Sequence, residues 1–248
     1  QNAIHYRVAT ISAFLFYTLF IYVFTMLWKA IYQEGSVHGY SYQQIVWYLI
    51  MTEFVGFACG TGIFRTMNED IKSGSVAYLL GRPTHYVFYQ LANSSGQVLI
   101  NAVSFGFLAA LLGLVLVGPL PGFHPASLPP VCLSVVLAVM INFFFRMLIG
   151  LSSFIMEENF ALFLIYQKLN FMLGMFLPVE FLPGWLQPVA KSLPFSYMYW
   201  APGKLFVNYS PTLFWQLVPR QAAWAAVLIV LTLLVYRASV RRLQVNGG

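Results

Sequence analysis

The stretch VLINAVSFGFLAALLGLVLV at residues 98–117 contains no charged side chain, and Asn101 and Ser104 are its only polar ones. About 20 such residues in a row are enough for a helix to cross the hydrocarbon core of a bilayer. In lipid the backbone must satisfy its own hydrogen bonds, so a helix is the expected form. Similar apolar stretches predict further spans at residues 8–28, 44–64, 130–154, 160–177 and 222–236. The sequence therefore predicts six transmembrane helices in a single domain over residues 1–248.

The composition of the whole chain agrees with this prediction. Hydrophobic residues make up 60% of the 248 residues and charged residues 8%, with a mean hydropathy of +0.74. A soluble domain carries about 25% charged residues, and a disordered chain needs low hydrophobicity. These figures exclude both classes and indicate an all-α integral membrane protein.

The positive charges predict the orientation of the chain. With the N-terminus in the cytoplasm, seven Lys and Arg residues lie on the cytoplasmic side and four on the outer side. Cytoplasmic loops carry the excess of Lys and Arg in most membrane proteins. We therefore expect a multi-pass protein of a bacterial inner membrane with both termini in the cytoplasm.

The segment 65–95, between the second and third predicted spans, is the most polar part of the chain. Asn68 or Asp70 could cap a short helix there, and Pro83 would end it. Its apolar residues fall on one helical face: Val76, Leu79 and Leu80. The spacing predicts an amphipathic helix on the cytoplasmic membrane surface, and a solvated loop is the alternative.

The segment 178–202 is too apolar for a free loop and too rich in proline for a span. Leu186, Val189, Ala190 and Leu193 follow helical spacing within it. We predict short helices that fold back into the outer leaflet, where irregular backbone must be buried in protein or line a cavity.

Ionisable residues within the spans are expected to mark a pathway or a partner, because they are costly in lipid. Glu53 lies near the middle of the second predicted span. Lys168, flanked by Gln167 and Asn170, lies near the middle of the fifth. Either Glu53 and Lys168 form an ion pair, or one of them faces a translocation cavity, or their polar contacts only fix helix packing.

Arg146 lies in the inner third of the fourth predicted span, and Glu157 and Glu158 follow at the end of that span. We expect Arg146 to reach the inner interface or to pair with one of these two carboxylates.

Motifs for catalysis or metal binding do not stand out in the sequence. The Walker pattern is missing, since Gly203-Lys204 is followed by leucine. The four histidines have no neighbouring ligand at metal-binding spacing, and no G-x-S-x-G elbow occurs. We therefore expect no enzyme activity, no metal and no cofactor bound by this chain.

Two segments carry a resemblance to a known family. The segment IKSGSVAYLLGRP at residues 71–83 resembles the pattern I-[KR]-x-G-x-[LV]-x-x-L-L-x-[KR]-P. The segment 178–194 resembles the pattern P-x-x-[FL]-[FL]-P…L-P. In this order, after the second and fifth spans, they are similar to the permease subunits of type-2 ABC exporters, the ABC-2 family, in the branch of viologen- and multidrug-exporter permeases.

This resemblance implies an assembly and its working parts. Two permeases, identical or different, would form a dimer, and two ABC ATPase subunits would bind ATP and Mg²⁺. The cytoplasmic segment would contain a helix that couples to the ATPase, with these contact residues: Glu69, Asp70, Ile71, Lys72, Gly74, Tyr78, Leu79, Arg82 and Pro83. The outer gate would comprise Pro178, Glu180, Phe181, Pro183, Trp185 and Pro194. The intramembrane polar residues would be Glu53, Lys168, Gln167, Asn170 and Arg146.

The function expected from these features is ATP-driven export of an amphiphilic substrate, such as a drug-like compound, lipid, peptide or glycan. A secondary transporter or channel is the alternative, although such proteins often carry paired broken helices and only one interruption is visible here. A membrane-embedded enzyme would need a catalytic cluster near one interface, which the sequence lacks.

Overall fold

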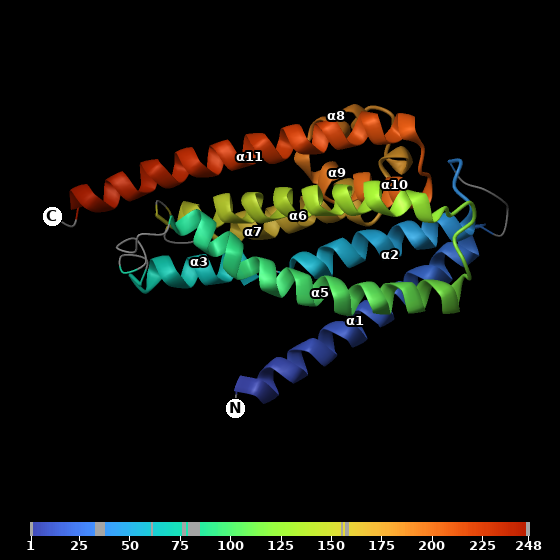
Figure 1. Ribbon diagram of the computed structural model, residues 1–248, viewed down its shortest axis with the longest axis horizontal. Coiled ribbons are helices and arrows are strands. Elements are labelled where there is room, and N and C mark those ends of the chain that lie inside the picture. The colour runs from blue at the N-terminus through green and yellow to red at the C-terminus, as the bar shows by residue number, and fades with distance from the viewer. Residues whose placement is uncertain are drawn as a thin grey trace.

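The protein is described by a computed structural model (Figure 1). The model describes the following residues: 2–32, 38–60, 62–75, 78, 85–154, 156 and 159–246. Side chains are described only for those of these residues that lie within 8–241. The described chain is 86% helical and contains no strand, which agrees with the predicted all-α class.

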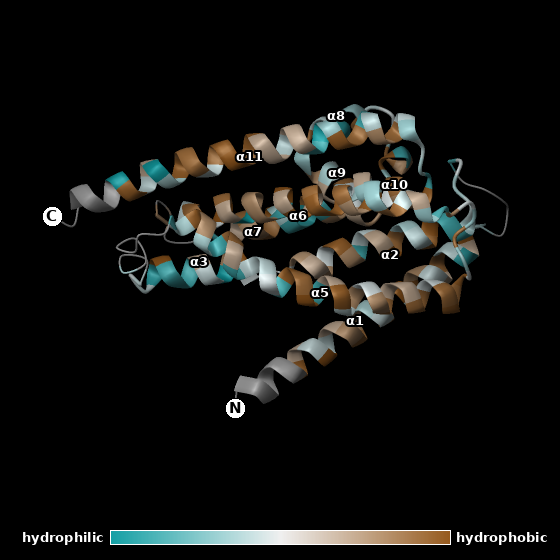
Figure 2. Ribbon diagram, viewed as in Figure 1, coloured by the Kyte–Doolittle hydropathy of each residue, from teal (hydrophilic) through white to brown (hydrophobic). Residues whose placement is uncertain are grey.

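Among the described residues, five segments are long and apolar enough to cross a membrane. Their helices are α1 (Asn2–Ile31), α2 with α3 (Tyr42–Cys59 and Gly62–Lys72), α5 (Tyr86–Leu116), α6 (Leu128–Leu151) and α11 (Pro211–Asn246). Hydrophobic residues dominate the middle of α1, α5 and α6, whereas polar residues gather on α3 and near the C-terminal end of α11 (Figure 2). This distribution is the one expected of helices that cross an apolar layer.

The fifth predicted span, at residues 160–177, is a shorter element. Helix α7 (Phe160–Asn170) has 11 residues and continues into the five-residue π-helix η4 (Phe171–Met175). At 1.5 Å per residue, the two together reach roughly 24 Å, less than the ~30 Å of the hydrocarbon core. In Figure 1, α7 runs alongside α6 and returns the chain toward the short helices that precede α11. The N-terminal and C-terminal ends of the chain both lie toward the end of the molecule that carries α3 (Figure 1).

The long helices extend beyond the predicted boundaries. Helix α5 begins at Tyr86, twelve residues before the predicted span, so residues 86–95 of the segment 65–95 belong to this helix. Helix α11 begins at Pro211 instead of residue 222, and Ser210 caps it by accepting a hydrogen bond from the backbone N–H of Leu213 at 3.1 Å. Hydropathy marks only the part of a helix that lies in lipid, whereas caps and breakers set where the helix ends.

Helix α2 is interrupted beside Gly60, whose φ of 55° lies in the region that glycine adopts without strain. Two side chains bond the carbonyls freed by this break. Arg146 Nη1 donates to the Cys59 carbonyl at 3.4 Å, and Asn101 Nδ2 donates to the Phe57 carbonyl at 3.4 Å. A guanidinium at a helix C-terminus also interacts favourably with the helix dipole. Arg146 is therefore bonded to the end of α2, and its other expected partners, Glu157 and Glu158, lie outside the described residues.

Helix α3 is amphipathic and lies before the residues for which the amphipathic cytoplasmic helix was predicted. Asn68 and Asp70 fall inside α3 and do not cap a following helix. The buried face of α3 consists of Ile63, Phe64 and Met67, which pack toward α6. The predicted apolar face at Val76, Leu79 and Leu80 lies outside the described residues.

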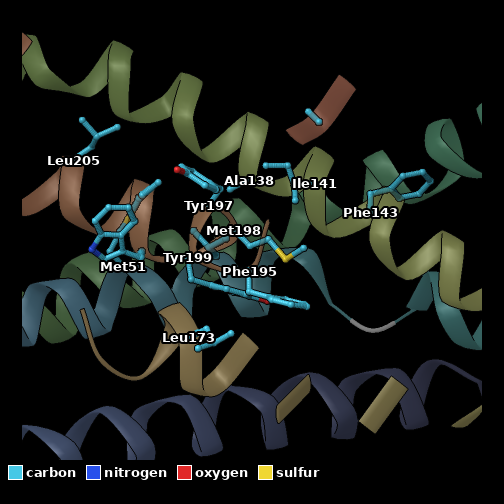
Figure 3. Close-up of a cluster of buried hydrophobic side chains, with 14 of the residues drawn as sticks. Met51, Ala138, Ile141, Phe143, Leu173, Phe195, Tyr197, Met198, Tyr199 and Leu205 are labelled. Carbon is cyan, nitrogen blue, oxygen red and sulfur yellow. The ribbon is translucent and has the colours of Figure 1, made fainter. Parts of the chain in front are cut away.

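Short helices fold back between α7 and α11, as predicted. They are η5 (Val179–Phe181), α8 (Leu186–Ser192), α9 (Pro194–Met198) and α10 (Trp200–Val207). Helix α9 is buried along its whole length and packs against α6, α11 and η4. Figure 3 shows Phe195, Tyr197, Met198 and Tyr199 of this region pointing in different directions into the surrounding core.

The irregular backbone of η4 is bonded by side chains of neighbouring helices. Tyr48 Oη donates to the Gly174 carbonyl at 2.6 Å, and Thr52 Oγ1 donates to the Met175 carbonyl at 2.7 Å. From α9, Ser196 Oγ donates to the Leu173 carbonyl at 2.9 Å. Side chains of α2 and α9 thus replace the bonds that the broken helix cannot make for itself.

Gly203 allows α10 to lie directly on α2. A Cβ atom at this position would come within 2.8 Å of the Tyr48 ring and 2.9 Å of the Thr52 methyl group. Both of these side chains are held by their bonds to η4, so neither can move away freely. We expect Gly203→Ala to lower the free energy of unfolding by about 1–3 kcal/mol through overpacking. Thermal unfolding of the purified protein in detergent measures this effect.

Gly184 provides the matched control, because a Cβ there would meet no atom within 4 Å. Gly184→Ala should leave the unfolding temperature unchanged. Equal behaviour of the two variants would contradict a close α10–α2 contact.

Candidate functional site

An open cleft of about 800 Å³ lies between α3 and α7 at the end of the molecule near the termini. Phe64, Phe160 and Phe163 form its apolar wall, and the Phe64 and Phe163 rings stack at 4.3 Å between centroids. Arg65, Glu69 and Lys72 line it from the exposed side of α3. The cleft therefore offers both signs of charge around an aromatic floor, which suits a protein surface with alternating charges.

The predicted coupling residues fall into four groups. Glu69 and Lys72 are exposed on α3, and Ile71 is half-buried. Asp70 is a structural residue, because its carboxylate accepts hydrogen bonds from Tyr86 Oη and Gln90 Nε2, both at 3.0 Å. Gly74 has a φ of 74° in the turn after α3, and Tyr78 is exposed. The remaining predicted residues lie outside the described part of the chain: Leu79, Arg82 and Pro83.

A buried polar network joins α6, α7 and α9 in the interior of the bundle. Tyr166 Oη and Tyr199 Oη both donate to Asn142 Oδ1, at 2.8 Å and 3.0 Å. The Arg146 guanidinium lies 5.8 Å from the centre of the Tyr166 ring and is 6% exposed. This arrangement fixes three helices relative to one another at the depth of the predicted path.

Glu53 and Lys168 are not brought together. Glu53 is 4% exposed and lies within α2. Lys168 and Gln167 are exposed on α7, whereas Asn170 is buried. Among the described residues, no ion pair involves Glu53 or Lys168. The arrangement leaves Glu53 as a buried carboxyl without an opposite charge, which is the usual mark of a functional position in a membrane span.

The other end of the bundle is closed by a cluster around Glu180. One oxygen of its carboxylate pairs with Lys204 of α10, and the other accepts hydrogen bonds from Tyr40 Oη at 3.2 Å and Trp200 Nε1 at 3.0 Å. The Lys204 ammonium also lies 5.9 Å and 5.6 Å from the Tyr40 and Trp200 ring centres, within cation–π range. We name these four residues, Tyr40, Glu180, Trp200 and Lys204, the Glu180 cluster.

The ring of Phe181 continues this cluster toward α1. Its centroid lies 5.7 Å from Trp28 and 5.8 Å from Tyr40. Pro178 precedes η5, and Pro183 follows it in the tight turn before α8. Pro194 is the first residue of α9, where proline costs nothing because that N–H has no helical partner. Trp185 is 74% exposed at the tip of the re-entrant segment.

A family model described as ABC-2 family transporter protein matches residues 7–247. The chain belongs to the ABC-2 transporter family. Membership makes the chain a membrane component of an ABC transporter, a part that is normally non-catalytic, and implies an ABC ATPase partner. No curated protein and no solved structure gives a match.

Several residues of this ABC-2 permease were missed by reasoning from sequence. Asn142 has no ionisable residue directly beside it in the sequence, although a single Asn in an apolar span is itself a signal of a polar contact. The Glu180–Lys204 pair was missed because its members lie 24 positions apart, one in the expected gate and one among the outer charges. Their pairing depends on how the short helices fold back, which no local pattern reveals.

The Glu180 cluster predicts a pH dependence of stability. Burial alone raises the pKa of Glu180, but its hydrogen bond to Lys204 and the charge of Lys204 outweigh burial, so the pKa lies below its ordinary value of 4.5. A group with a lowered pKa in the folded state stabilises the protein above the unfolded pKa and loses that effect as the pH falls through the folded one. We therefore expect the contribution of Glu180 to be complete above pH 4.5 and to disappear below it.

The test compares thermal unfolding of the wild type and of Glu180→Gln between pH 7 and pH 3. Glu180→Gln should lower the free energy of unfolding by about 2 kcal/mol at pH 7, because the Lys204 charge stays partly buried without its partner. The difference in the free energy of unfolding between the wild type and Glu180→Gln should become smaller below pH 4.5. Adding Lys204→Met should recover part of the loss, and a double mutant no better than the sum of its single mutants would contradict the pairing.

Proposed function

We propose that this chain is the permease of an ATP-driven exporter that moves an amphiphilic substrate out of the cytoplasm, in the viologen- and multidrug-exporter branch of the family. The substrate would be a drug-like compound, lipid, peptide or glycan. Two ABC ATPase subunits would bind ATP and Mg²⁺, and a second permease, identical or different, would complete the path. The charged cleft between α3 and α7 is the observation that carries this proposal.

The position of α3 supports a coupling role. Its apolar face is packed on α6, and its opposite face presents Arg65, Glu69 and Lys72 at one end of the bundle. A displacement of α3 would therefore be transmitted directly to α6, with no flexible linker between them. From α6 the packing continues to α9 and α10 and so to the Glu180 cluster.

The opposite end supports the role of an outer gate. The outer part of the re-entrant segment is held by the bonds around Glu180, whereas α9 is held separately by bonds of Ser196 to Leu173 and of Gln221 to Tyr197. Such a segment can move as a unit when these few bonds are exchanged. In this proposal α3 and both termini face the cytoplasm, and Trp185 lies at the outer interface of the inner membrane.

The first test is copurification of the tagged chain from native membranes in mild detergent, followed by mass spectrometry. We expect an ATPase with a Walker motif in equimolar amount. Reversing two charges of α3, Glu69→Lys with Arg65→Glu, should reduce the copurified ATPase about ten-fold while leaving the unfolding temperature unchanged.

Arg220→Glu is the matched control, since Arg220 is exposed on α11 far from the cleft. This variant should copurify as much ATPase as the wild type. A chain that purifies without any ATPase and transports in the presence of vanadate would contradict the exporter and favour a secondary transporter.

Glu53 supports a preference for cationic substrates, because a buried carboxyl without a positive partner can supply one for a cation in transit. Glu53→Gln has nearly the same shape and should abolish stimulation of the ATPase by cationic amphiphiles. Stimulation by neutral amphiphiles should persist. An unchanged substrate profile of the reconstituted complex would remove Glu53 from the path.

A further inference from the structure

A second cavity, of about 500 Å³, lies away from the charged cleft and is bordered by α5 and α6. Both helices pack on α2 and α3, and they run at an angle to each other (Figure 1). The break at Cys59 and Gly60 contributes to the lining. Nothing in the proposed coupling or gating uses this cavity.

Two buried polar residues line the cavity and have atoms without a partner. Gln90 is 1% exposed, and its Oε1 accepts no hydrogen bond. Its Nε2 donates to Asp70, and since a carboxylate can only accept, the amide cannot be turned the other way. Gln90 Oε1 is therefore an unpaired acceptor, and the bond from Nε2 to Asp70 fixes the orientation of the amide.

Arg146 is the second such residue. Its Nη1 bonds the Cys59 carbonyl, but its Nε has no partner. Among the described residues, no carboxylate lies within 4 Å of this guanidinium. Burying a charge is costly unless it is paired, and a phosphate is a favoured partner of arginine.

The lining changes from polar to apolar along α5 and α6, starting from the end near α3. Toward the α3 end, α5 supplies Gln90, Asn93 and Ser94, and α6 supplies Arg146. Further into the membrane, the lining residues of the two antiparallel helices are apolar, for example Ala102 and Val136. A molecule with a polar head at the interface and an apolar chain directed to the bilayer centre matches this gradient.

From these observations we infer that the cavity between α5 and α6 is a binding site for an anionic phospholipid from the leaflet on the α3 side. The phosphate would accept from Arg146, a hydroxyl or ammonium of the headgroup would donate to Gln90 Oε1, and one acyl chain would lie along Ala102 and Val136. The site does not depend on an ATPase or on export. Only the identification of this leaflet as the cytoplasmic one rests on the proposed function.

The test is a titration of the purified full-length protein, followed by native mass spectrometry. The probes are phosphatidylglycerol and phosphatidylcholine with the same acyl chains, and inorganic phosphate as competitor. We expect one phosphatidylglycerol to bind about ten-fold more tightly than phosphatidylcholine, with no displacement by millimolar phosphate. Equal binding of the two lipids, or displacement by phosphate alone, would overturn the inference.

Two variants address the two ends of the cavity, each with a matched control. Arg146→Gln removes the charge, and Arg220→Gln removes an exposed charge elsewhere. Ala102→Trp fills the apolar end, and Ala110→Trp adds the same ring at an exposed position of α5 outside the cavity. Each cavity variant should weaken phosphatidylglycerol binding about ten-fold, and each control should stay within about two-fold of the wild type.

Ala102→Trp decides the question if Arg146→Gln fails to fold, because Ala102 takes no part in the break of α2. An Ala102→Trp protein that binds phosphatidylglycerol like the wild type would overturn the site. The lipid site would also be overturned if a cavity variant changed the mass of the oligomer and left phosphatidylglycerol binding unchanged. A second copy of the chain would then occupy this face. These outcomes are read without any ATPase, so they are independent of the exporter proposal.

Discussion

Every interruption of a helix within the hydrocarbon layer must be satisfied by the protein itself, and this constraint organises the whole molecule. The chain breaks its helices beside Gly60 and again through η4. At the first break the freed carbonyls bond Arg146 and Asn101. At the second they bond Tyr48, Thr52 and Ser196.

Helix α2 becomes the centre of the bundle for the same reason. It carries Tyr48 and Thr52, which complete η4, and its own end is completed by α6. Gly203 brings α10 against the same two side chains. The two ends of the molecule are therefore linked through a rigid polar framework, and a displacement at α3 does not have to be transmitted by lipid-facing apolar contacts alone.

The sequence was sufficient for the all-α class of fold and for the re-entrant segment. Hydropathy located the spans, because lipid selects long apolar stretches, and the prolines of residues 178–194 located the re-entrant helices. It failed at helix ends, since the helix that contains the third predicted span begins twelve residues earlier, at Tyr86. It also failed for pairs of residues. Glu53 and Lys168 lie at similar predicted depth yet do not pair, whereas Glu180 and Lys204 do, and depth along a span says nothing about which face of a helix meets a neighbour.

The two ends of the bundle differ in how completely their charges are satisfied. The Glu180 carboxylate has Lys204, Tyr40 and Trp200 as partners, so this end is complete within one chain. Arg146 has a single carbonyl and an aromatic face, and its Nε is left without a partner. A half-satisfied buried charge is unfavourable on its own, whereas the same charge beside a ligand phosphate is not. The self-contained bonds therefore lie at the re-entrant segment, and the unpartnered Nε of Arg146 lies beside the cavity between α5 and α6.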